Sequence, residues 1–251
     1  MFHQFSLKDE DLKAASEISR FPHSSKESLP RQQFVNVVVN KPWGYEFLSC
    51  ESSSTACWNL YIKFNSQTSM HAHPGKQTIM VPLTDGIVLS TLESQHALRS
   101  GDIAYIDAGV FHRSTSTSID GDFMLEFETP VDKFDLIRLD DSYGRVKSAY
   151  EGIEHETPTD QGIHFQQWLQ SRNFESSKYQ FQMGDHTIHF YPGAELNPVS
   201  LEEWSKSLNL VVVIDRKHES PNAITFSSPR DIVKEDFSDK VALGIQLNRS
   251  K

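Results

Sequence analysis

The stretch SMHAHPGKQTIM, residues 69–80, places two histidines two positions apart, His71 and His73, and follows them with Gln77. Successive side chains of a β-strand point to opposite faces, so His71 and His73 share one face of a strand. Two imidazoles that converge on one point are typical of a metal site. A lone histidine is more often a hydrogen-bonded interior residue, so the metal interpretation needs a further ligand from elsewhere in the chain.

The sequence around this stretch alternates as short β-strands do. Between Phe34 and Thr129 apolar residues recur with a period of two, and turn sequences such as TDG (84–86) and DGD (120–122) separate the segments. Many short strands at close spacing predict a mainly β sandwich or barrel. The expected strands are FVNVVVN (34–40), WNLYIKF (58–64), QTIMVPL (77–83), GIVLSTL (86–92), DIAYID (102–107) and DFMLEFET (122–129).

The regions on either side of this pattern differ from it. Residues 1–33 are expected to form an N-terminal helical segment, with an amphipathic helix over 6–21 that Ser6 caps. Residues 34–150 form the predicted barrel with a wrapping tail. Residues 151–251 are interpreted as an α+β C-terminal extension, with a degenerate second barrel as the alternative. Its expected strands lie in 178–191, 208–215, 222–226 and 242–247, and its expected helices in 164–172 and 199–208.

Composition excludes several function classes. The chain has 251 residues and a formal charge of -10, which argues against a broad contact with a nucleic-acid backbone. No apolar run approaches the roughly 20 residues that cross a bilayer, and no signal peptide is recognisable near the start, so we expect a cytoplasmic protein without membrane contact. In that compartment Cys50 and Cys57 are expected to be reduced thiols, although a disulfide between them is the alternative.

A third imidazole comes from a distant segment, GDIAYIDAGVFHRST at residues 101–115. Gly101 and Gly109 permit tight turns on either side of a strand, and His112 then begins another strand. If that strand lies beside the one that carries His71 and His73, the three rings meet.

The two histidine segments resemble the two motifs of the cupin superfamily. In cupins the first motif gives two histidines and a glutamate, and the second, G-x5-P-x-G-x2-H, gives a third histidine. Gly101, Gly109 and His112 fit the second motif, with Asp107 where proline is usual. The resemblance implies a double-stranded β-helix, or jelly-roll, barrel. It also implies four metal ligands, which are His71, His73, Gln77 and His112.

Gln77 stands where the cupin pattern has glutamate. Three neutral imidazoles and a neutral amide leave the charge of a divalent cation uncompensated, so metal affinity is expected to be lower than with a carboxylate. Zinc, iron, manganese and nickel are all compatible with these nitrogen and oxygen donors. The sequence therefore predicts a divalent transition metal without identifying it.

A wider resemblance is to the cupin domain of type II phosphomannose isomerases. It rests on NKPWGYEFL (40–48), on the histidine segments, and on the tail MLEFETPVDKFDLIRLDDSYGR (124–145). It covers roughly residues 40–146 and implies a mannose-6-phosphate isomerase-like activity. The matching tail residues are Asp135, Ile137, Arg138, Asp141, Tyr143, Gly144 and Arg145.

Candidate substrate groups follow from the same tail and from the last expected strand. Arg138 and Arg145 are planar cations suited to a phosphate, with surface ion pairs as the alternative. In FMLEFET (123–129) the carboxylates of Glu126 and Glu128 share a face, which we expect to point into the barrel. The reverse orientation leaves them in water. We assign Glu126 as catalytic base, Lys63 as acid, and Glu128 and Tyr143 to substrate binding.

Three functions are compatible with these residues. The first is metal-dependent aldose–ketose isomerisation of a sugar phosphate or related carbohydrate through an enediol. The second is Fe(II)-dependent dioxygenation. The third is non-catalytic binding of a sugar or metabolite by a cupin that has lost its metal. A small-molecule substrate and a homodimer are expected.

Overall fold

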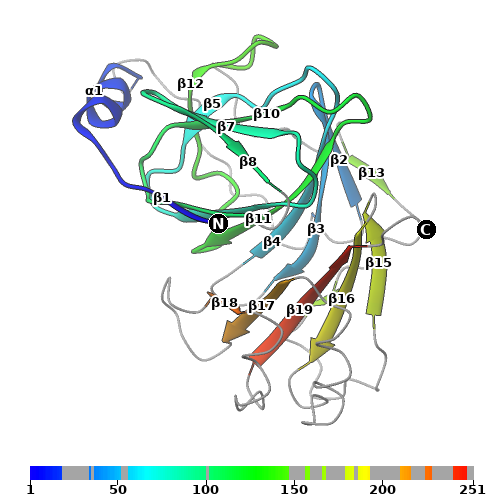
Figure 1. Ribbon diagram of the computed structural model, residues 1–251. Coiled ribbons are helices and arrows are strands. Elements are labelled where there is room, and N and C mark those ends of the chain that lie inside the picture. Colours follow the sequence, from blue (N-terminus) through cyan, green and yellow to red (C-terminus); the bar gives the residue numbers. More distant parts are fainter. Residues whose placement is uncertain are drawn as a thin grey trace. The chain divides into compact units, whose positions relative to one another are not determined.

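The computed structural model describes most of the N-terminal half of the chain and a set of strands after it. The described residues are 1–18, 34, 37–51, 56–99, 102–146, 156–158, 166–167, 179–183, 186–192, 210–215, 224–227 and 240–247. The chain divides into two compact units, one of residues 1–51 and 55–166 and one of 52–54 and 167–251 (Figure 1).

The first unit contains helix α1 (Asp9–Ile18) and two sheets, which are antiparallel apart from the pairing of β1 with β9. One sheet has the order β1-β9-β6-β11-β4-β3-β2-β13, with β14 paired to β3, and the other has the order β12-β5-β10-β7-β8. The strands are β1 (Phe2–Phe5), β2 (Val37–Lys41), β3 (Gly44–Glu51), β4 (Ala56–Ile62), β5 (Met70–Ala72), β6 (Gln77–Pro82), β7 (Ile87–Thr91), β8 (Gln95–Leu98), β9 (Ile103–Ile106), β10 (His112–Ser116), β11 (Asp122–Thr129), β12 (Ile137–Asp140), β13 (Glu156–Pro158) and β14 (Gln166–Gln167).

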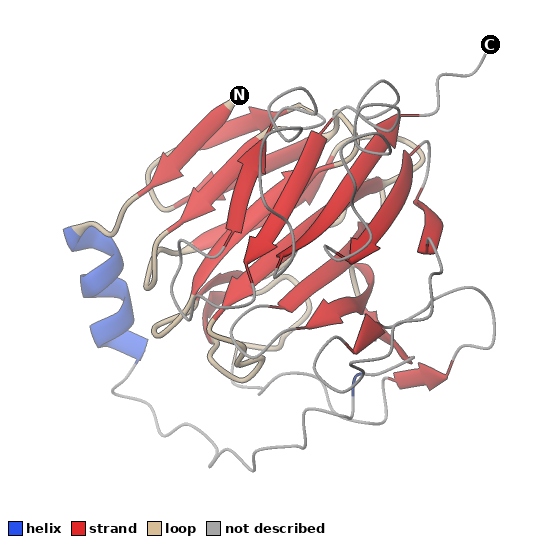
Figure 2. Cartoon of the chain, turned by 90° about the horizontal axis from the view of Figure 1, so that it is seen from below, coloured by secondary structure: helices blue, strands red, loops and turns tan. Residues whose placement is uncertain are grey.

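The strand order is that of a jelly roll. From β4 to β11 the chain alternates between the sheets, placing β4, β6, β9 and β11 in one and β5, β7, β8 and β10 in the other (Figure 1). The first set is ordered β9-β6-β11-β4 and the second β5-β10-β7-β8, which are the two four-stranded sheets of two interleaved Greek keys. The expected fold class, a mainly β double-stranded β-helix of the cupin type, is confirmed. Strands also dominate the view in Figure 2.

The inner face of the larger sheet changes character along its strands. On β4, Trp58, Leu60 and Ile62 are buried in the core, as the period of two predicts. On the neighbouring β11, Met124 joins this core, whereas Glu126 and Glu128 continue the same face beyond it. The fold therefore has an apolar core at one end and a buried charged region at the other.

Glycine is required at position 44, in the sequence PWGYE. A Cβ atom on Gly44 would lie 1.9 Å from the backbone oxygen of Tyr61 on β4. Next to this contact, the backbone oxygen of Trp43 accepts a hydrogen bond from the backbone N–H of Lys63 at 2.9 Å. Close approach of β3 to β4 thus explains the glycine of this motif.

The N-terminal segment contains more than the expected helix. Strand β1 pairs in parallel with β9, with Phe2 opposite Ile103. Helix α1 begins at Asp9 and not after Ser6, because the Asp11 carboxylate accepts the backbone N–H of Lys8 at 3.1 Å and caps the first turn. The other Asp11 oxygen accepts the N–H of Phe111 at 3.0 Å, which fixes the helix start next to His112.

The second unit contains one described antiparallel sheet, ordered β15-β16-β19-β17-β18. Its strands are β15 (Tyr179–Met183), β16 (His186–Pro192), β17 (Leu210–Asp215), β18 (Ile224–Ser227) and β19 (Lys240–Leu247). Each of them overlaps a segment expected to be a strand, within two residues at its ends. The helix predicted over 164–172 is wrong at Gln166–Gln167, which form β14, and the helix predicted over 199–208 lies outside the described residues. None of the described helices has the length and apolarity to cross a membrane.

Asp122, at the start of β11, joins three strands of the jelly roll. Its carboxylate accepts hydrogen bonds from Thr84 and Gly86 before β7 and from Ser116, Thr117 and Ser118 at the end of β10. Burial raises the pKa of the Asp122 carboxyl, but the hydrogen bonds from Ser116, Thr84 and Ser118 outweigh burial and hold the pKa below its usual value.

We predict that Asp122→Asn lowers the free energy of unfolding by about 3 kcal/mol at pH 7, because buried donors lose a charged acceptor. The depressed pKa stabilises the fold above the unfolded value of 3.8, and this contribution is lost as the pH falls through the folded pKa. The difference in the free energy of unfolding between wild type and Asp122→Asn should therefore become smaller below pH 4. Urea denaturation at pH 7 and pH 3 measures it, and an equal gap at both pH values would contradict the prediction.

Candidate metal centre

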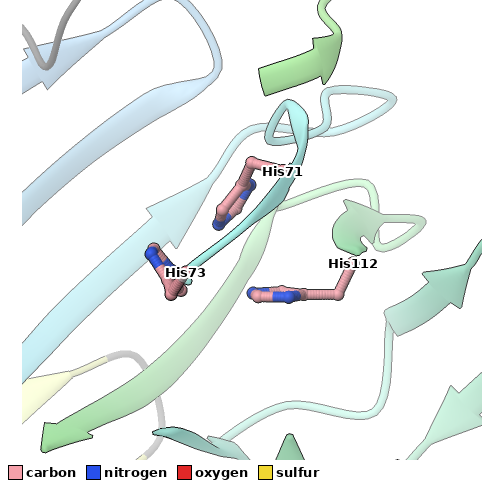
Figure 3. Close-up of side chains that lie close together, drawn as sticks. All are labelled: His71, His73 and His112. Carbon is pink, nitrogen blue, oxygen red and sulfur yellow. The ribbon is translucent and has the colours of Figure 1, made fainter. Parts of the chain in front are cut away.

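Three histidines meet on the inner face of the smaller sheet. His112 begins β10 and lies directly opposite His71 of β5, so the two side chains point to the same face. His73 follows the last residue of β5 and returns to that face. Figure 3 shows the three rings pointing toward one another. One nitrogen from each ring lies within 4.8 Å of the other two, and the ring centroids are 4.4, 4.9 and 5.5 Å apart.

The hydrogen bonds of the three rings assign their tautomers. The Nδ1 atom of His71 lies 2.8 Å from the oxygen of Ser69, that of His112 lies 3.0 Å from the oxygen of Val110, and that of His73 lies 2.6 Å from the oxygen of Asp135. A carbonyl oxygen only accepts, so each Nδ1 carries a proton and donates it. Each Nε2 of the neutral ring then keeps its lone pair for a metal.

The electrostatic surroundings keep these rings neutral. Burial lowers the pKa of His71 and His73 well below the usual value, with further lowering from His112 on His71 and from Lys76 on His73. Burial also lowers the pKa of His112 to about 4. The Nε2 atoms of His73 and His112 are buried and have no hydrogen-bond partner among the described residues. Three neutral, buried imidazoles with converging lone pairs fit a divalent transition metal.

Gln77 does not complete this set, which corrects the expected fourth ligand. In the pairing of β6 with β11, Met80 lies opposite Glu126, and both line the cavity beside the histidines. Gln77 is an odd number of residues from Met80 and points to the other face of the sheet. There its side chain hydrogen-bonds Tyr105. The physical reason is that Gln77 is the first residue of β6. Side chains alternate between the two faces of the sheet from there, so Thr78 and the preceding Lys76 point to the inner face and Gln77 does not.

The cavity next to the histidines is small and strongly charged. Its volume is about 60 Å³, and Trp43 forms part of its wall. The ionisable residues that line it are His71, His73, Glu46, Glu126, Lys41, Lys76 and Lys133.

The carboxylate of Glu126 lies close to the histidines. Its side chain is buried, and its Oε1 atom lies 3.9 Å from Nε2 of His73. Burial raises the pKa of the Glu126 carboxyl, Lys133 opposes this shift, and Glu128 adds to it. The ligand atoms of the three histidines all lie within 4.8 Å of one another, and Glu126 does not belong to this cluster. It therefore lies beside the three imidazoles and not among them. A carboxyl group with a raised pKa at this place is suited to proton transfer.

Glu128 points inward as well but is fully engaged. Its Oε1 accepts the indole N–H of Trp58 at 3.0 Å, and its Oε2 forms an ion pair with Lys76. Burial raises the pKa of Glu128, but Lys76 and Lys133 outweigh burial and lower it. Glu128 therefore holds Lys76 in place and does not line the cavity, contrary to the expected role in substrate binding.

The cations of the cavity are lysines that sequence reasoning missed. Lys133 lies 3.1 Å from Glu46 and 3.8 Å from the centroid of the Trp58 ring, and Lys41 lies 3.6 Å from the same glutamate. Burial opposes the charged form of Lys133, but Glu46, Glu128 and Glu126 together raise its pKa. Lys76 precedes β6 and Lys133 follows β11. The period of two within a strand therefore does not predict where their side chains point. A lysine within three residues of a ligand histidine was the available signal for Lys76.

Lys63, the expected acid, lies outside the site. It follows the last residue of β4 and its side chain is exposed. Because Ile62 points into the core, the next residue points away from it. The assignment of Lys63 as a catalytic residue is therefore corrected.

The tail arginines differ from each other in position. Arg138 is buried and lies opposite His71 in the pairing of β12 with β5, so it is next to the centre. Arg145 instead forms an ion pair with Asp141 at 2.6 Å, and its guanidinium lies 5.3 Å from the Tyr143 ring. Tyr143 is 37% exposed. Arg145 and Tyr143 thus form a local turn and do not line the cavity, because Asp141 binds the arginine within its own segment.

No protein-family model matches the sequence, and a search of curated proteins gave no match. Solved structures with a similar fold include an RmlC-like cupin from Shewanella frigidimarina, with 12% identity, a TM-score of 0.35, and coverage of 43% of this chain and 95% of that one. A cupin sugar phosphate isomerase from Silicibacter pomeroyi has 12% identity, a TM-score of 0.31, and coverage of 43% and 70%.

The DMSP lyase DddQ from Ruegeria pomeroyi has 19% identity, a TM-score of 0.31, and coverage of 35% and 46%. These likenesses are too weak to indicate an activity. The jelly-roll assignment rests on the strand order.

We predict that the purified protein binds one divalent metal ion per chain and that His112→Ala abolishes this binding, because two imidazoles remain. Gln77→Ala serves as the matched control and should bind metal as wild type does, since Gln77 faces the other side of the sheet. Elemental analysis after dialysis against Zn²⁺ or Fe²⁺ gives the stoichiometry. Loss of metal in Gln77→Ala, with retention in His112→Ala, would contradict the assigned ligands.

Proposed function

We propose that the chain is a metal-dependent enzyme that moves a proton between adjacent carbons of a sugar phosphate or related carbohydrate, as an aldose–ketose isomerase does. The observation that carries this proposal is the position of Glu126. A buried carboxyl group with a raised pKa lies 3.9 Å from the Nε2 atom of His73. It lies beside three imidazoles whose ligand nitrogens are close to one another.

His71, His73 and His112 are the residues that would hold the metal, through their Nε2 atoms. A divalent metal in such a site polarises a carbonyl oxygen and so acidifies the neighbouring carbon–hydrogen bond. In this reaction the Glu126 carboxylate takes the proton from C2 of an aldose and returns it to C1, with an enediol between the two transfers. The hydroxyl proton of the sugar passes from O2 to O1 in the same interconversion, so that no proton is gained or lost. The raised pKa of Glu126 strengthens it as a base.

The charges around the cavity favour an anionic substrate. Lys41, Lys76 and Lys133 balance Glu46, Glu126 and Glu128 in number, and Arg138 adds a further positive charge next to His71. A bound divalent cation raises the excess of positive charge further. A phosphate or carboxylate group of the substrate is attracted to such a region. Lys133 is suited to this role as a fixed cation, because its pKa is raised and it lines the cavity.

The size of the cavity favours a short substrate. A volume of about 60 Å³ is far below the roughly 300–1,000 Å³ of pockets that enclose drug-sized ligands. The cavity is open on one side, so the reacting carbons of a sugar lie next to the histidines and the rest of a longer substrate extends out of it. Triose and tetrose phosphates, which extend least, are the first compounds to test, ahead of mannose 6-phosphate.

The proposal is tested by incubating metal-loaded protein with phosphorylated sugars of three to six carbons in D₂O. Deuterium incorporation at C1 or C2, followed by NMR, reports proton transfer even where little net isomerisation occurs. Exchange that needs both metal and protein supports the proposal. No exchange with any of these sugars, in protein shown to contain metal, overturns it.

A second candidate function is Fe(II)-dependent dioxygenation. It is favoured by the three-histidine cluster found among the described residues, because three protein ligands leave several positions of an Fe(II) ion open for dioxygen and a substrate. Oxygen consumption that requires Fe(II) and a small organic substrate distinguishes it from isomerisation. Wild-type protein that binds sugars but no metal would instead indicate a non-catalytic binding protein.

We predict that Glu126→Gln lowers kcat by about 10²- to 10⁴-fold, since the amide cannot accept the proton. Metal content should not change, because Glu126 lies beside the three imidazoles. Lys63→Met is the control for a lysine remote from the cavity and should leave kcat and KM unchanged. Full activity of Glu126→Gln in the deuterium-exchange assay would rule Glu126 out as the base.

A further inference from the structure

The three imidazoles are held in two different ways. The Nδ1 atoms of His71 and His112 donate to carbonyl oxygens two residues earlier in the chain, those of Ser69 and Val110. The Nδ1 atom of His73 donates to the carbonyl oxygen of Asp135, which is 62 residues away. His73 is also outside β5, so strand pairing does not fix its ring. Its orientation depends on where the tail segment lies.

The side chain of Asp135 ties that segment to the histidine loop. Its Oδ2 atom accepts the backbone N–H of Gly75 at 2.7 Å, two residues after His73. One residue therefore holds the loop twice, through its backbone oxygen on His73 and through its carboxylate on Gly75.

Further hydrogen bonds make the tail a defined platform for this contact. Lys76 donates to the backbone oxygen of Asp132 at 3.1 Å, and the N–H of Asp135 donates to the same oxygen at 3.2 Å. The Asp132 carboxylate accepts the N–H of Phe134 at 2.9 Å. Beyond this turn, β12 continues along β5 with Arg138 opposite His71. The turn of residues 132–135 is thus joined to the loop of residues 73–76 on one side and to the histidine strand on the other.

We propose that Asp135 is a positioning residue of the metal centre, which fixes the tautomer and direction of the His73 ring through its hold on the loop of residues 73–76. This inference rests on the metal site of the proposed function. It gives the tail segment a role different from binding a phosphate: the tail sets the affinity of the site for metal. Groups that orient metal-bound histidines typically change metal affinity by about 10- to 100-fold when they are removed.

The test compares three variants with wild type. Asp135→Ala removes the carboxylate, and Asp135→Asn keeps an oxygen that accepts the Gly75 N–H. Asp140→Asn is the matched control, because Asp140 lies on the same tail but forms an exposed ion pair with Arg113. Zn²⁺ affinity is measured by competition with a chromogenic chelator. We expect about 10- to 100-fold weaker binding for Asp135→Ala and wild-type binding for the other two.

A second readout does not need the metal. In metal-free protein with ¹⁵N-labelled histidine, NMR shows which ring nitrogen carries the proton. Wild type should show His73 as the single Nδ1–H tautomer, and Asp135→Ala should show a mixture for His73 alone, with His71 and His112 unchanged. If Asp135→Ala does not fold, Asp135→Ser, whose side chain is too short to reach Gly75, takes its place.

The two readouts separate this inference from the proposed function. Wild-type Zn²⁺ affinity in Asp135→Ala, with an unchanged His73 tautomer, overturns the role of Asp135 and leaves the metal site standing. Wild-type protein that binds no Zn²⁺ overturns the metal site, while the tautomer of His73 still decides whether Asp135 positions the ring.

Discussion

The structure depends on the hydrogen bonds between three imidazole Nδ1–H groups and three main-chain carbonyl oxygens. Each bond fixes one tautomer and turns the Nε2 lone pair of its ring toward the other two. Burial keeps all three rings neutral, so the lone pairs are available, and two of the Nε2 atoms find no partner among the described residues. Leaving buried polar atoms without partners costs free energy, and a bound metal ion would remove this cost.

The jelly roll provides the surroundings in which this arrangement is stable. The inner face of β11 passes from Met124 in the apolar core to Glu126 and Glu128 in the charged region. Buried carboxylates are costly unless they are paired, and Lys76 and Lys133 supply the pairing. Glu128 is held by two donors and remains a support, whereas Glu126 keeps a raised pKa and lines the cavity. The same strand thus carries one carboxyl group with a lowered pKa and one with a raised pKa, because their neighbours differ.

The sequence predicted the fold well because its signals were local. Alternation with a period of two identified β2, β4, β6, β9 and β11 of the larger sheet and β7 of the smaller one, whereas β1, β3, β8 and β12 were not predicted. The spacing of His71, His73 and His112 identified the residues that meet. The orientation of Glu126 followed from the same alternation. Gln77 was wrongly predicted to be a metal ligand, because its position in the motif does not show where β6 begins. Lys63 was wrongly predicted to be the acid, because it lies just after the end of β4 and points away from the core. Lys133 was missed and Asp135 was given no role, because their contacts join segments between 60 and 87 residues apart. A single sequence carries no signal for such contacts.

The central claim is that one metal ion is bound by the Nε2 atoms of His71, His73 and His112. Anomalous diffraction from a crystal of metal-loaded protein, recorded at the absorption edge of the metal, tests it most directly. The account predicts a single peak per chain, about 2.0–2.1 Å from each of the three Nε2 atoms. A peak elsewhere in the molecule, or metal-soaked crystals in which these three atoms surround no peak, would contradict it.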